Sequence, residues 1–371
     1  MIPTSAIRPQ CRLAVWSTTT QLSQLYTGFS LLARRGEIVL SQHIAAPPPV
    51  PQNLPRHLRD AHNGHLGVQL DGRFNLYFDT HDSHEIHPEA LRRCDLYFKR
   101  SFAPALLSAE ERAKVLPLGL SYEVYAGAFD RYELVREVRS ERNFRGAASA
   151  LVGYGVSTVA ALAGVGRRRC SYRYLSAPPA PKMQPRVLFM TRVWDPAEIE
   201  GATSEKLEER VALNDLRAAC ILRLRRELGG AFVGGLQHSE FARRHYPAAL
   251  LDDDTISPRN RYIEQMRAFP ICIATTGLHG SIGWKMAEYT AFAKAIASEP
   301  LRYVVPGDFS DGRNYVSFTS PEACAEGVIN LMDDAHRREA QMESNWQYFR
   351  SFVRPDAMVR NAINEARTRL G

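Results

Sequence analysis

Short apolar runs alternate with longer amphipathic stretches along the first half of the chain. Five of these runs predict strands, at residues 13–17, 37–41, 75–79, 95–99 and 114–117. Residues 20–35 and 88–93 predict helices, the second with Pro88 in its first turn. The proline-rich segment 45–55 predicts a loop. Such an alternation of strands and helices indicates an α/β fold with a parallel, doubly wound sheet.

The alternation stops near residue 166 and begins again at residue 186. Between them, the Pro- and Ala-rich stretch 177–182 is typical of a stiff linker. Beyond it, strands are predicted at residues 186–191, 231–233, 271–275 and 295–299, and helices at 204–228, 257–268, 281–294, 321–333 and over most of 335–371.

We therefore expect two Rossmann-like domains, residues 1–165 and 186–345, joined by a linker at 166–185. A C-terminal helical segment, 346–371, is expected to pack back on the N-terminal domain. Two such domains would face each other across a cleft, where ligands bind at the carboxyl ends of the strands.

Charge narrows the classes of partner. The 371-residue chain has a net charge of +7 and a pI near 9.1, and only six of its 47 basic residues are lysine. Arginine suits forked contacts with phosphate, so three partners fit: nucleic acid, an anionic membrane surface or a phosphorylated small molecule. Because the sequence contains no zinc finger, RNP-like stretch or basic recognition helix, we expect no nucleic-acid partner.

The cysteines indicate a reducing compartment. All six lie far apart without a Cys-x-x-Cys pair, a spacing that disfavours both a disulfide framework and a zinc site. Residues 1–9 lack the charged-then-apolar order of a signal peptide. These features predict a cytoplasmic protein.

Residues 147–166 form an uncharged run of small and apolar residues, with Arg142 and Arg145 before it and Arg167 to Arg169 after it. Its length approaches that of a spanning helix, but glycine, serine and threonine dilute its hydrophobicity. The favoured interpretation is a buried helix and linker. The second is contact of residues 142–169 with an anionic membrane surface, peripheral on its inner face, and the third is a membrane span.

The most informative segment is 271–299. A buried strand runs into a loop that holds Gly277, Gly280 and Gly283, and a helix follows. Glycines let backbone amides approach a ligand, and the start of the new helix favours an anion. Lys285, about one turn into that helix, adds a full positive charge.

This segment resembles the donor site of the group-1 glycosyltransferases of the GT-B fold. Their signature is a Glu, then Gly-Phe-Gly-Leu-Pro, then a second Glu at a helix start. Residues 281–285 stand in the Gly-Phe-Gly-Leu-Pro place, Glu288 matches the second Glu, and residues 295–299 match the strand that follows. The resemblance, looser over 186–334, implies that the C-terminal domain binds a nucleotide sugar, that the N-terminal domain is the acceptor side, and that Glu288 contacts the ribose.

Gly280 replaces the first Glu of the signature, which in the family engages the donor sugar. His279, directly ahead of it, is the candidate for that contact. Arg192 follows strand 186–191 and is placed to fork onto the diphosphate, with a salt bridge to Asp195 as the alternative. The expected donor site, without a metal, consists of Arg192, Gly280, Ser281, Gly283, Lys285 and Glu288.

Residues 79–87 place six titratable side chains after a predicted strand. His81 or Asp82 is the candidate general base for an acceptor hydroxyl. A metal site from His81, His84 and His87 is disfavoured by their spacing, and a polar surface loop is the remaining interpretation.

These expectations describe a metal-independent glycosyltransferase acting on a glycan or lipid-linked acceptor, and the resemblance suggests bacterial surface polysaccharide assembly. The partial signature favours retention of anomeric configuration, whereas Gly280 and the His/Asp loop leave inversion open. One alternative is a sugar-nucleotide epimerase of the same architecture, which needs no acceptor. The other is a catalytically inert relative that binds a nucleotide sugar or a partner enzyme.

Overall fold

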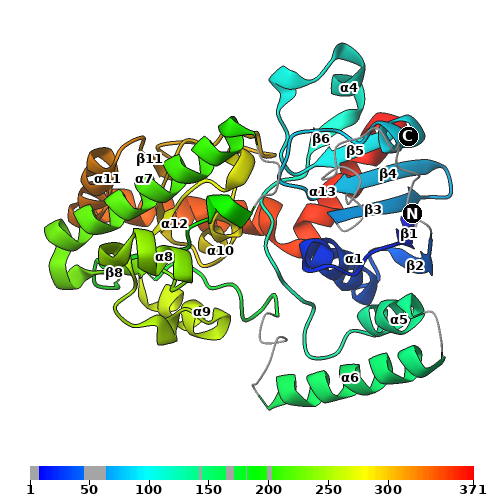
Figure 1. Cartoon of the computed structure of the whole chain (residues 1–371). Helices are drawn as coiled ribbons and strands as arrows, with labels where there is room; N and C mark the ends of the chain where they lie inside the picture. Colours follow the sequence, from blue (N-terminus) through cyan, green and yellow to red (C-terminus); the bar gives the residue numbers. More distant parts are fainter. Residues whose placement is uncertain (1–7, 46–63, 142–143, 164–170, 181, 199–202) are drawn as a thin grey trace. The chain divides into compact units, whose positions relative to one another are not determined.

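The chain folds into two α/β units (Figure 1). The computed structural model describes residues 8–45, 64–141, 144–163, 171–180, 182–198 and 203–371. Unit 1 comprises Met1–Leu175, Val304–Pro306 and Arg350–Gly371, and unit 2 comprises Ser176–Tyr303 and Gly307–Phe349. Arg142, Arg167 to Arg169 and Cys170 lie outside the described residues.

Unit 1 is built on a six-stranded sheet of order β2-β1-β3-β4-β5-β6. In chain order its strands are β1 Gln10–Val15, β2 Val39–Ile44, β3 His65–Leu70, β4 Phe74–Asp79, β5 Leu96–Lys99 and β6 Val115–Pro117. Strand β3 runs antiparallel to both of its neighbours, while the other pairs are parallel. The prediction of a wholly parallel sheet is therefore wrong in unit 1.

A hairpin explains the antiparallel strand. Asp71 and Gly72 connect β3 to β4, and both have positive φ, 54° and 68°. An Asp-Gly pair with this geometry turns two strands back on each other. The same dipeptide is visible in the sequence and is the signal that the prediction overlooked.

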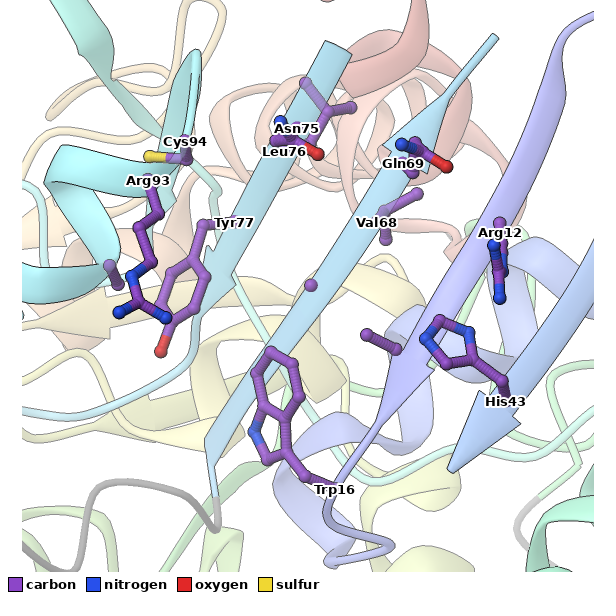
Figure 2. A pocket seen from close by; sticks show the side chains of 13 residues that line it. Arg12, Trp16, His43, Val68, Gln69, Asn75, Leu76, Tyr77, Arg93 and Cys94 are labelled. Atoms are coloured by element: carbon purple, nitrogen blue, oxygen red, sulfur yellow. The ribbon is translucent and has the colours of Figure 1, made fainter. Parts of the chain in front are cut away.

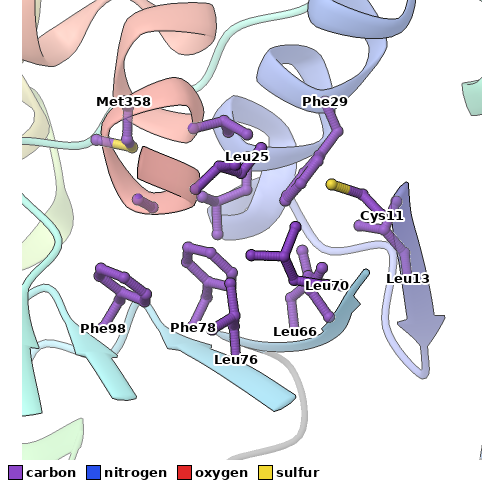
Figure 3. Packing of buried hydrophobic residues seen from close by; sticks show 14 of the residues in the cluster. Cys11, Leu13, Leu25, Phe29, Leu66, Leu70, Leu76, Phe78, Phe98 and Met358 are labelled. Atoms are coloured by element: carbon purple, nitrogen blue, oxygen red, sulfur yellow. The ribbon is translucent and has the colours of Figure 1, made fainter. Parts of the chain in front are cut away.

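The core of unit 1 lies between the sheet and two helices, α1 Ser23–Arg34 and α13 Pro355–Leu370. Alternate residues of each strand point into it, so that Leu13, Leu66 and Phe78 meet Phe29 of α1 and Met358 of α13 (Figure 3). The prediction that C-terminal helices pack on the N-terminal domain is confirmed for α13. The other helices of unit 1 are α3 Pro88–Arg93, α4 Ala109–Lys114, α5 Arg131–Ser140 and α6 Phe144–Leu162.

Helix α6 occupies the uncharged run, and it is not buried. Its large apolar side chains are mostly exposed, including Phe144, Val152 and Leu162. The interpretation of this run as a buried helix is therefore wrong. Among the described residues, no helix has the length and apolar character needed to cross a membrane.

Unit 2 has a five-stranded sheet of order β11-β10-β9-β7-β8, with every pair parallel. Its strands are β7 Val187–Thr191, β8 Phe232–Leu236, β9 Ile271–Ala274, β10 Ala295–Ser298 and β11 Val316–Ser317. Its helices are α7 Ser204–Leu228, α8 Glu240–His245, α9 Arg259–Ala268, α10 Trp284–Ala291, α11 Pro321–Asp333 and α12 Ala335–Tyr348. This is the predicted doubly wound sheet.

The cysteines within the described residues are buried and unbridged: Cys11, Cys94, Cys220, Cys272 and Cys324. They fill the cores as small apolar side chains, as predicted.

Candidate functional site

The strand order of unit 2 marks one position at the carboxyl edge of its sheet. From β7 the chain moves outward to β8 on one side, and then returns to β9 and continues on the other side. The loops after β7 and β9 therefore leave the sheet in opposite directions. The position between these two strands is the topological switch point, where open α/β sheets bind ligands. Arg192 follows β7 directly, and the glycine loop follows β9.

Arg217 of α7 joins these two loops. Its guanidinium donates to the backbone carbonyl of Arg192 at 2.8 Å, to that of Thr276 at 2.7 Å and to Thr275 Oγ1 at 3.1 Å. Burial lowers the pKa of Arg217 to about 10, with Glu299 opposing the shift. Glu299 itself accepts from the Thr276 backbone at 2.8 Å and from its hydroxyl at 3.1 Å. Neither Arg217 nor Glu299 was identified from the sequence, because each looks there like a solvent-exposed charged residue.

The backbone of the glycine loop disfavours the family's first Glu at position 280. His279 and Gly280 both have φ of 62°, a region that costs a residue with a Cβ about 1–2 kcal/mol. A Cβ at Gly280 would also lie 2.8 Å from Cδ of Arg302. Tyr303 donates to the His279 carbonyl at 2.6 Å, and the Gly280 amide donates to Glu209 at 3.2 Å. Glycine at position 280 avoids both the backbone strain and the contact with Arg302.

Ser281 and Gly283 complete the loop in different ways. Ser281 is buried, and its carbonyl accepts from the Gly277 amide at 2.8 Å. Gly283 is the N-cap of α10, with extended backbone and no side-chain cap. A Cβ there would come no closer than 3.7 Å to the Thr275 carbonyl, so the approach to the first turn of α10 is open on that side. An uncapped helix start of this kind suits an anion.

Lys285 and Glu288 lie in a cluster of charged and aromatic side chains on α9 and α10. Glu288 is buried and pairs with Arg259, while Nζ of Lys285 lies 4.1 Å from the centre of the Tyr262 ring. Burial lowers the pKa of Lys285 to about 8; Glu288 opposes the shift, and Arg259 and Arg217 add to it. Lys285 therefore carries its charge at neutral pH at the start of α10. The ribose contact that the resemblance implies for Glu288 stays a prediction.

Arg192 is exposed, and its guanidinium lies 3.9 Å from the centre of the Trp194 ring. Asn214 holds Trp194 by accepting from its amide at 2.9 Å and donating to its carbonyl at 2.8 Å. Asp195 accepts from the Ala197 amide at 2.8 Å, and no ion pair between Asp195 and Arg192 occurs among the described residues. In the described structure Arg192 therefore stacks on Trp194 rather than pairing with Asp195.

A second polar cluster lies at the carboxyl edge of the unit 1 sheet, around Asp79. Nε2 of His65 and Nδ1 of His81 each lie 3.2 Å from Asp79 Oδ1. These two ring nitrogens are 2.8 Å apart. Lys99 Nζ donates to Asp79 Oδ2 at 2.8 Å, and the Tyr97 hydroxyl donates to the same oxygen. Burial by itself would raise the pKa of Asp79, but Lys99 and the two histidines hold it well below its usual range. Asp79 is therefore a permanent carboxylate that orients its neighbours.

His81 is the member of this cluster that reaches solvent. Its side chain is 29% exposed, whereas those of His65, Asp79 and Lys99 are buried. When Nδ1 of His81 donates toward Asp79, Nε2 carries no proton and can accept one. Burial lowers the pKa of His65 to about 4, so this second ring is neutral and supports His81 without adding charge.

Within the part of the chain that the structure describes, His65, Asp79 and His81 are also the candidate metal ligands. Donor atoms of His65, Asp79 and His81 all lie within 4.8 Å of one another. The buried Lys99 ammonium, 2.8 Å from Asp79, already neutralises the carboxylate and would repel a cation. We therefore interpret the cluster as a hydrogen-bonded relay that places a base.

The other residues of the loop 79–87 point to different partners. Asp82 is exposed and pairs with Arg100. His87 is buried and accepts from the Ala90 amide at 3.2 Å, which makes it the N-cap of α3. The triplet of His81, His84 and His87 is therefore not the group that the structure brings together. His65, which is brought in by the pairing of β3 with β4, was missed.

A pocket of about 330 Å³ opens on the sheet face of unit 1 opposite the α1 and α13 core. Figure 2 shows Arg12, Trp16 and Tyr77 along its wall, with Arg93 on the neighbouring α3. Tyr77 links this pocket to the Asp79 cluster, because its hydroxyl lies 2.7 Å from His65 Nδ1.

Comparison with known proteins finds similarity only among solved structures. No protein-family model and no curated protein matches the chain. One similar structure is the C-terminal domain of LpcC from Francisella tularensis, a group 1 family glycosyl transferase, the family that the sequence resembles. The match has 13% identity and a TM-score of 0.32, and covers 48% of this chain and 95% of that one.

Two further structures were solved with bound nucleotide. HepE from Anabaena, in complex with UDP-glucose, has 12% identity and a TM-score of 0.37, over 97% of this chain and 100% of that one. TarM from S. aureus, in complex with UDP among other ligands, has 12% identity and a TM-score of 0.34, over 51% of this chain and 37% of that one. All these scores are too low to support a functional argument, so any function proposed for the protein depends on the residues of this chain.

Proposed function

We propose that the protein is a glycosyltransferase that takes a sugar from a nucleotide-sugar donor bound by unit 2. The observation that carries this proposal is the arrangement at the switch point of the unit 2 sheet. There the loop after β7 supplies Arg192, and the loop after β9 supplies the open start of α10 together with Lys285. An arginine fork, a lysine and the amides of a helix start are groups that bind a diphosphate.

These groups would act on the leaving group. Glycosyl transfer breaks the bond between the anomeric carbon and the diphosphate, and the electron pair leaves with the nucleoside diphosphate. Positive groups fixed in place stabilise the charge as it develops. Glu288 would act here by holding Arg259, and the ribose contact is the further role that the resemblance implies for it. His279, next to Gly280 in the loop, remains the candidate for the donor sugar.

The acceptor side would use His81 of unit 1. The acceptor hydroxyl attacks the anomeric carbon, and its proton passes to Nε2 of His81, whose other nitrogen is held by Asp79. Direct displacement of this kind inverts the anomeric configuration, whereas the partial sequence signature favours retention. Asp82 is the less suitable base, because Arg100 already binds its carboxylate. The proposed acceptor is a glycan or a lipid-linked sugar of bacterial surface polysaccharide assembly.

The test is an assay of the whole chain with a panel of nucleotide sugars and sugar acceptors. We expect release of nucleoside diphosphate together with a sugar-extended product, whose anomeric configuration follows from its proton NMR couplings. The variant His81→Gln is expected to lower kcat by about a hundredfold or more. His84→Gln is the matched control from the same loop, and it should leave kcat close to that of the wild type.

Other outcomes would contradict the proposal in distinct ways. Conversion of the nucleotide sugar into its epimer without release of nucleoside diphosphate would indicate an epimerase. Donor binding without turnover of any acceptor would indicate the inert relative, for which Gly280 in place of the family's Glu is the supporting feature.

A further inference from the structure

One face of helix α6 is apolar and turned toward solvent. Phe144, Val159 and Leu162 are 87%, 67% and 76% exposed, far above the values of side chains in a packed interface. At 3.6 residues per turn these positions fall on one side of the helix. We call this side the outer face of α6; its residues are Phe144, Ala148, Leu151, Val152, Gly155, Val156, Val159 and Leu162.

The opposite side of α6 holds the helix against unit 1. Tyr154 is buried, and its hydroxyl bonds both the carbonyl of Asp130 at 2.9 Å and the amide of Asp130 at 2.7 Å. Helix α6 lies along α5 (Figure 1). Ser157 and Thr158 donate to the Tyr154 carbonyl of their own helix at 2.9 and 2.8 Å.

The polarity of α6 is thus the reverse of that of an ordinary surface helix. Among the described residues, Tyr154, Ser157 and Thr158 have hydrogen-bond partners within unit 1, whereas the apolar side chains of the outer face are exposed. A contiguous exposed apolar face of this kind marks a surface that another phase or molecule covers.

Charge indicates what covers it. From Arg142 to Trp194 the sequence contains no Asp or Glu, so every charged residue of α6 and of the segment that follows it is basic. These residues are Arg142, Arg145, Arg167, Arg168, Arg169, Arg173, Lys182, Arg186 and Arg192. An apolar stripe with basic flanks and no acidic residue complements a membrane whose headgroups are anionic. A second copy of the chain is a poorer partner, because its α6 would bring the same positive flanks together.

We propose that α6 lies in the plane of an anionic membrane surface and inserts its outer face between the headgroups. Arg145, which is exposed at the start of the helix, contacts the headgroups. Nineteen residues of helix extend about 28 Å along the surface at 1.5 Å per residue. This inference concerns unit 1 alone and does not depend on the proposed glycosyl transfer.

The experiment is co-sedimentation of the whole chain with lipid vesicles. We expect binding to vesicles that contain phosphatidylglycerol, weaker binding when salt is raised, and little binding to phosphatidylcholine alone. The double variant Val152→Glu/Val156→Glu should lower the partition coefficient at least about tenfold, because it places two charges where apolar groups insert. Val211→Glu/Leu222→Glu, on two exposed apolar positions of α7, is the matched control and should bind as the wild type does.

A second variant keeps the test valid if the charged one unfolds. Val156→Trp preserves the apolar character of the outer face, and its fluorescence should shift to the blue when phosphatidylglycerol vesicles are added. No blue shift, or equal sedimentation of the wild type and the Val152→Glu/Val156→Glu variant, would overturn the proposal.

Self-association is the competing outcome. Sedimentation velocity without lipid should show that the wild type and the double variant have the same mass. A dimer that the double variant abolishes, together with no binding to phosphatidylglycerol vesicles, would assign the outer face to a contact between copies and overturn the proposal.

Discussion

At the scale of single residues, the chain places its buried charges in two clusters that differ in purpose. Around Asp79 the carboxylate is fully paired, and His81 is the member whose side chain reaches solvent. Around Lys285 the charged group itself is destabilised by burial, and a nearby anion would restore it. The first arrangement suits a positioned base and the second suits an anion site.

The Asp79 cluster should be essential for stability. Removing the carboxylate by Asp79→Asn leaves the buried Lys99 ammonium without its partner, which costs about 3–5 kcal/mol in the free energy of unfolding. Urea unfolding at pH 7 measures this loss. Asp82→Asn is the matched control. The Asp82 carboxylate is exposed, so its ion pair with Arg100 should contribute less than about 1 kcal/mol to the free energy of unfolding.

The pH dependence of this loss has a definite sign. Because the pKa of Asp79 is held below its usual value, its stabilising effect is complete above the unfolded pKa, near 3.9, and is lost only at lower pH. The difference between the wild type and Asp79→Asn should therefore be constant from pH 7 to about pH 4. A difference that shrinks near neutral pH would contradict this account.

Lys285 should make donor binding depend on pH. Its pKa is lowered to about 8, so above pH 8 it must take up a proton before it can pair with a phosphate. The dissociation constant of a nucleotide sugar should then rise about tenfold between pH 7 and pH 9. Isothermal titration calorimetry at the two pH values measures this change.

Lys285→Arg is the control for the pH effect, because arginine stays protonated over this range. Its dissociation constant should be nearly the same at pH 7 and pH 9. An equal rise in both proteins would show that Lys285 is not the group responsible.

Residue patterns in the sequence indicated some of these groups and could not indicate others. The glycine loop and Lys285 were visible because they are local: strand, glycines and helix follow one another in the chain. His65 was missed because only the register of β3 against β4 places it opposite Asp79. Arg217 was missed because a buried arginine in the middle of a helix looks the same in sequence as an exposed one.

At the scale of elements, strong local signals predicted the structure well. Helices α7 and α11 have the bounds that the sequence predicted, 204–228 and 321–333, although the N-cap of α7 is Thr203 and makes no side-chain hydrogen bond. The helix predicted from residue 281 begins instead at Trp284, because the positive φ of Gly280 ends the 3₁₀ turn before it and Gly283 caps the helix. Strand β3 was missed because its hairpin turn was not recognised.

Helices α1 and α13 of unit 1 approach closely at Gly28, which makes their contact possible. A Cβ at Gly28 would lie 2.2 Å from the Pro355 carbonyl and 2.5 Å from Cγ2 of Val359. Gly28→Ala should therefore push the helices apart and lower the free energy of unfolding by about 1–3 kcal/mol or more, as measured by urea denaturation.

A second glycine provides the control for that prediction. A Cβ at Gly153 of α6 would meet no other atom within 4 Å, so Gly153→Ala should be neutral or stabilising by about 0.5–1 kcal/mol. Equal effects of the two substitutions would mean that the α1–α13 contact is looser than the structure shows.

At the scale of the whole molecule, the chain returns to its first unit after building its second. Unit 2 is bounded by Ser176 and Phe349, and Arg350–Gly371 belongs again to unit 1 through α13. The length and alternation of the sequence predicted two α/β domains and a C-terminal helix that packs on the first. The composition of the chain identified an excess of arginine, and the structure gives two of these arginines distinct positions, Arg217 inside the switch point and Arg192 at its surface.

The central claim is that the switch point of unit 2 binds the diphosphate of a nucleotide sugar. The most direct measurement is calorimetric titration of the whole chain with UDP-, GDP-, dTDP- and CMP-sugars, repeated with Arg192→Ala and with Arg244→Ala, an exposed arginine of α8, as the control. We expect one donor class to bind, with affinity reduced about tenfold or more in Arg192→Ala and unchanged in Arg244→Ala. Binding of no nucleotide sugar, or equal affinity in all three proteins, would contradict the claim.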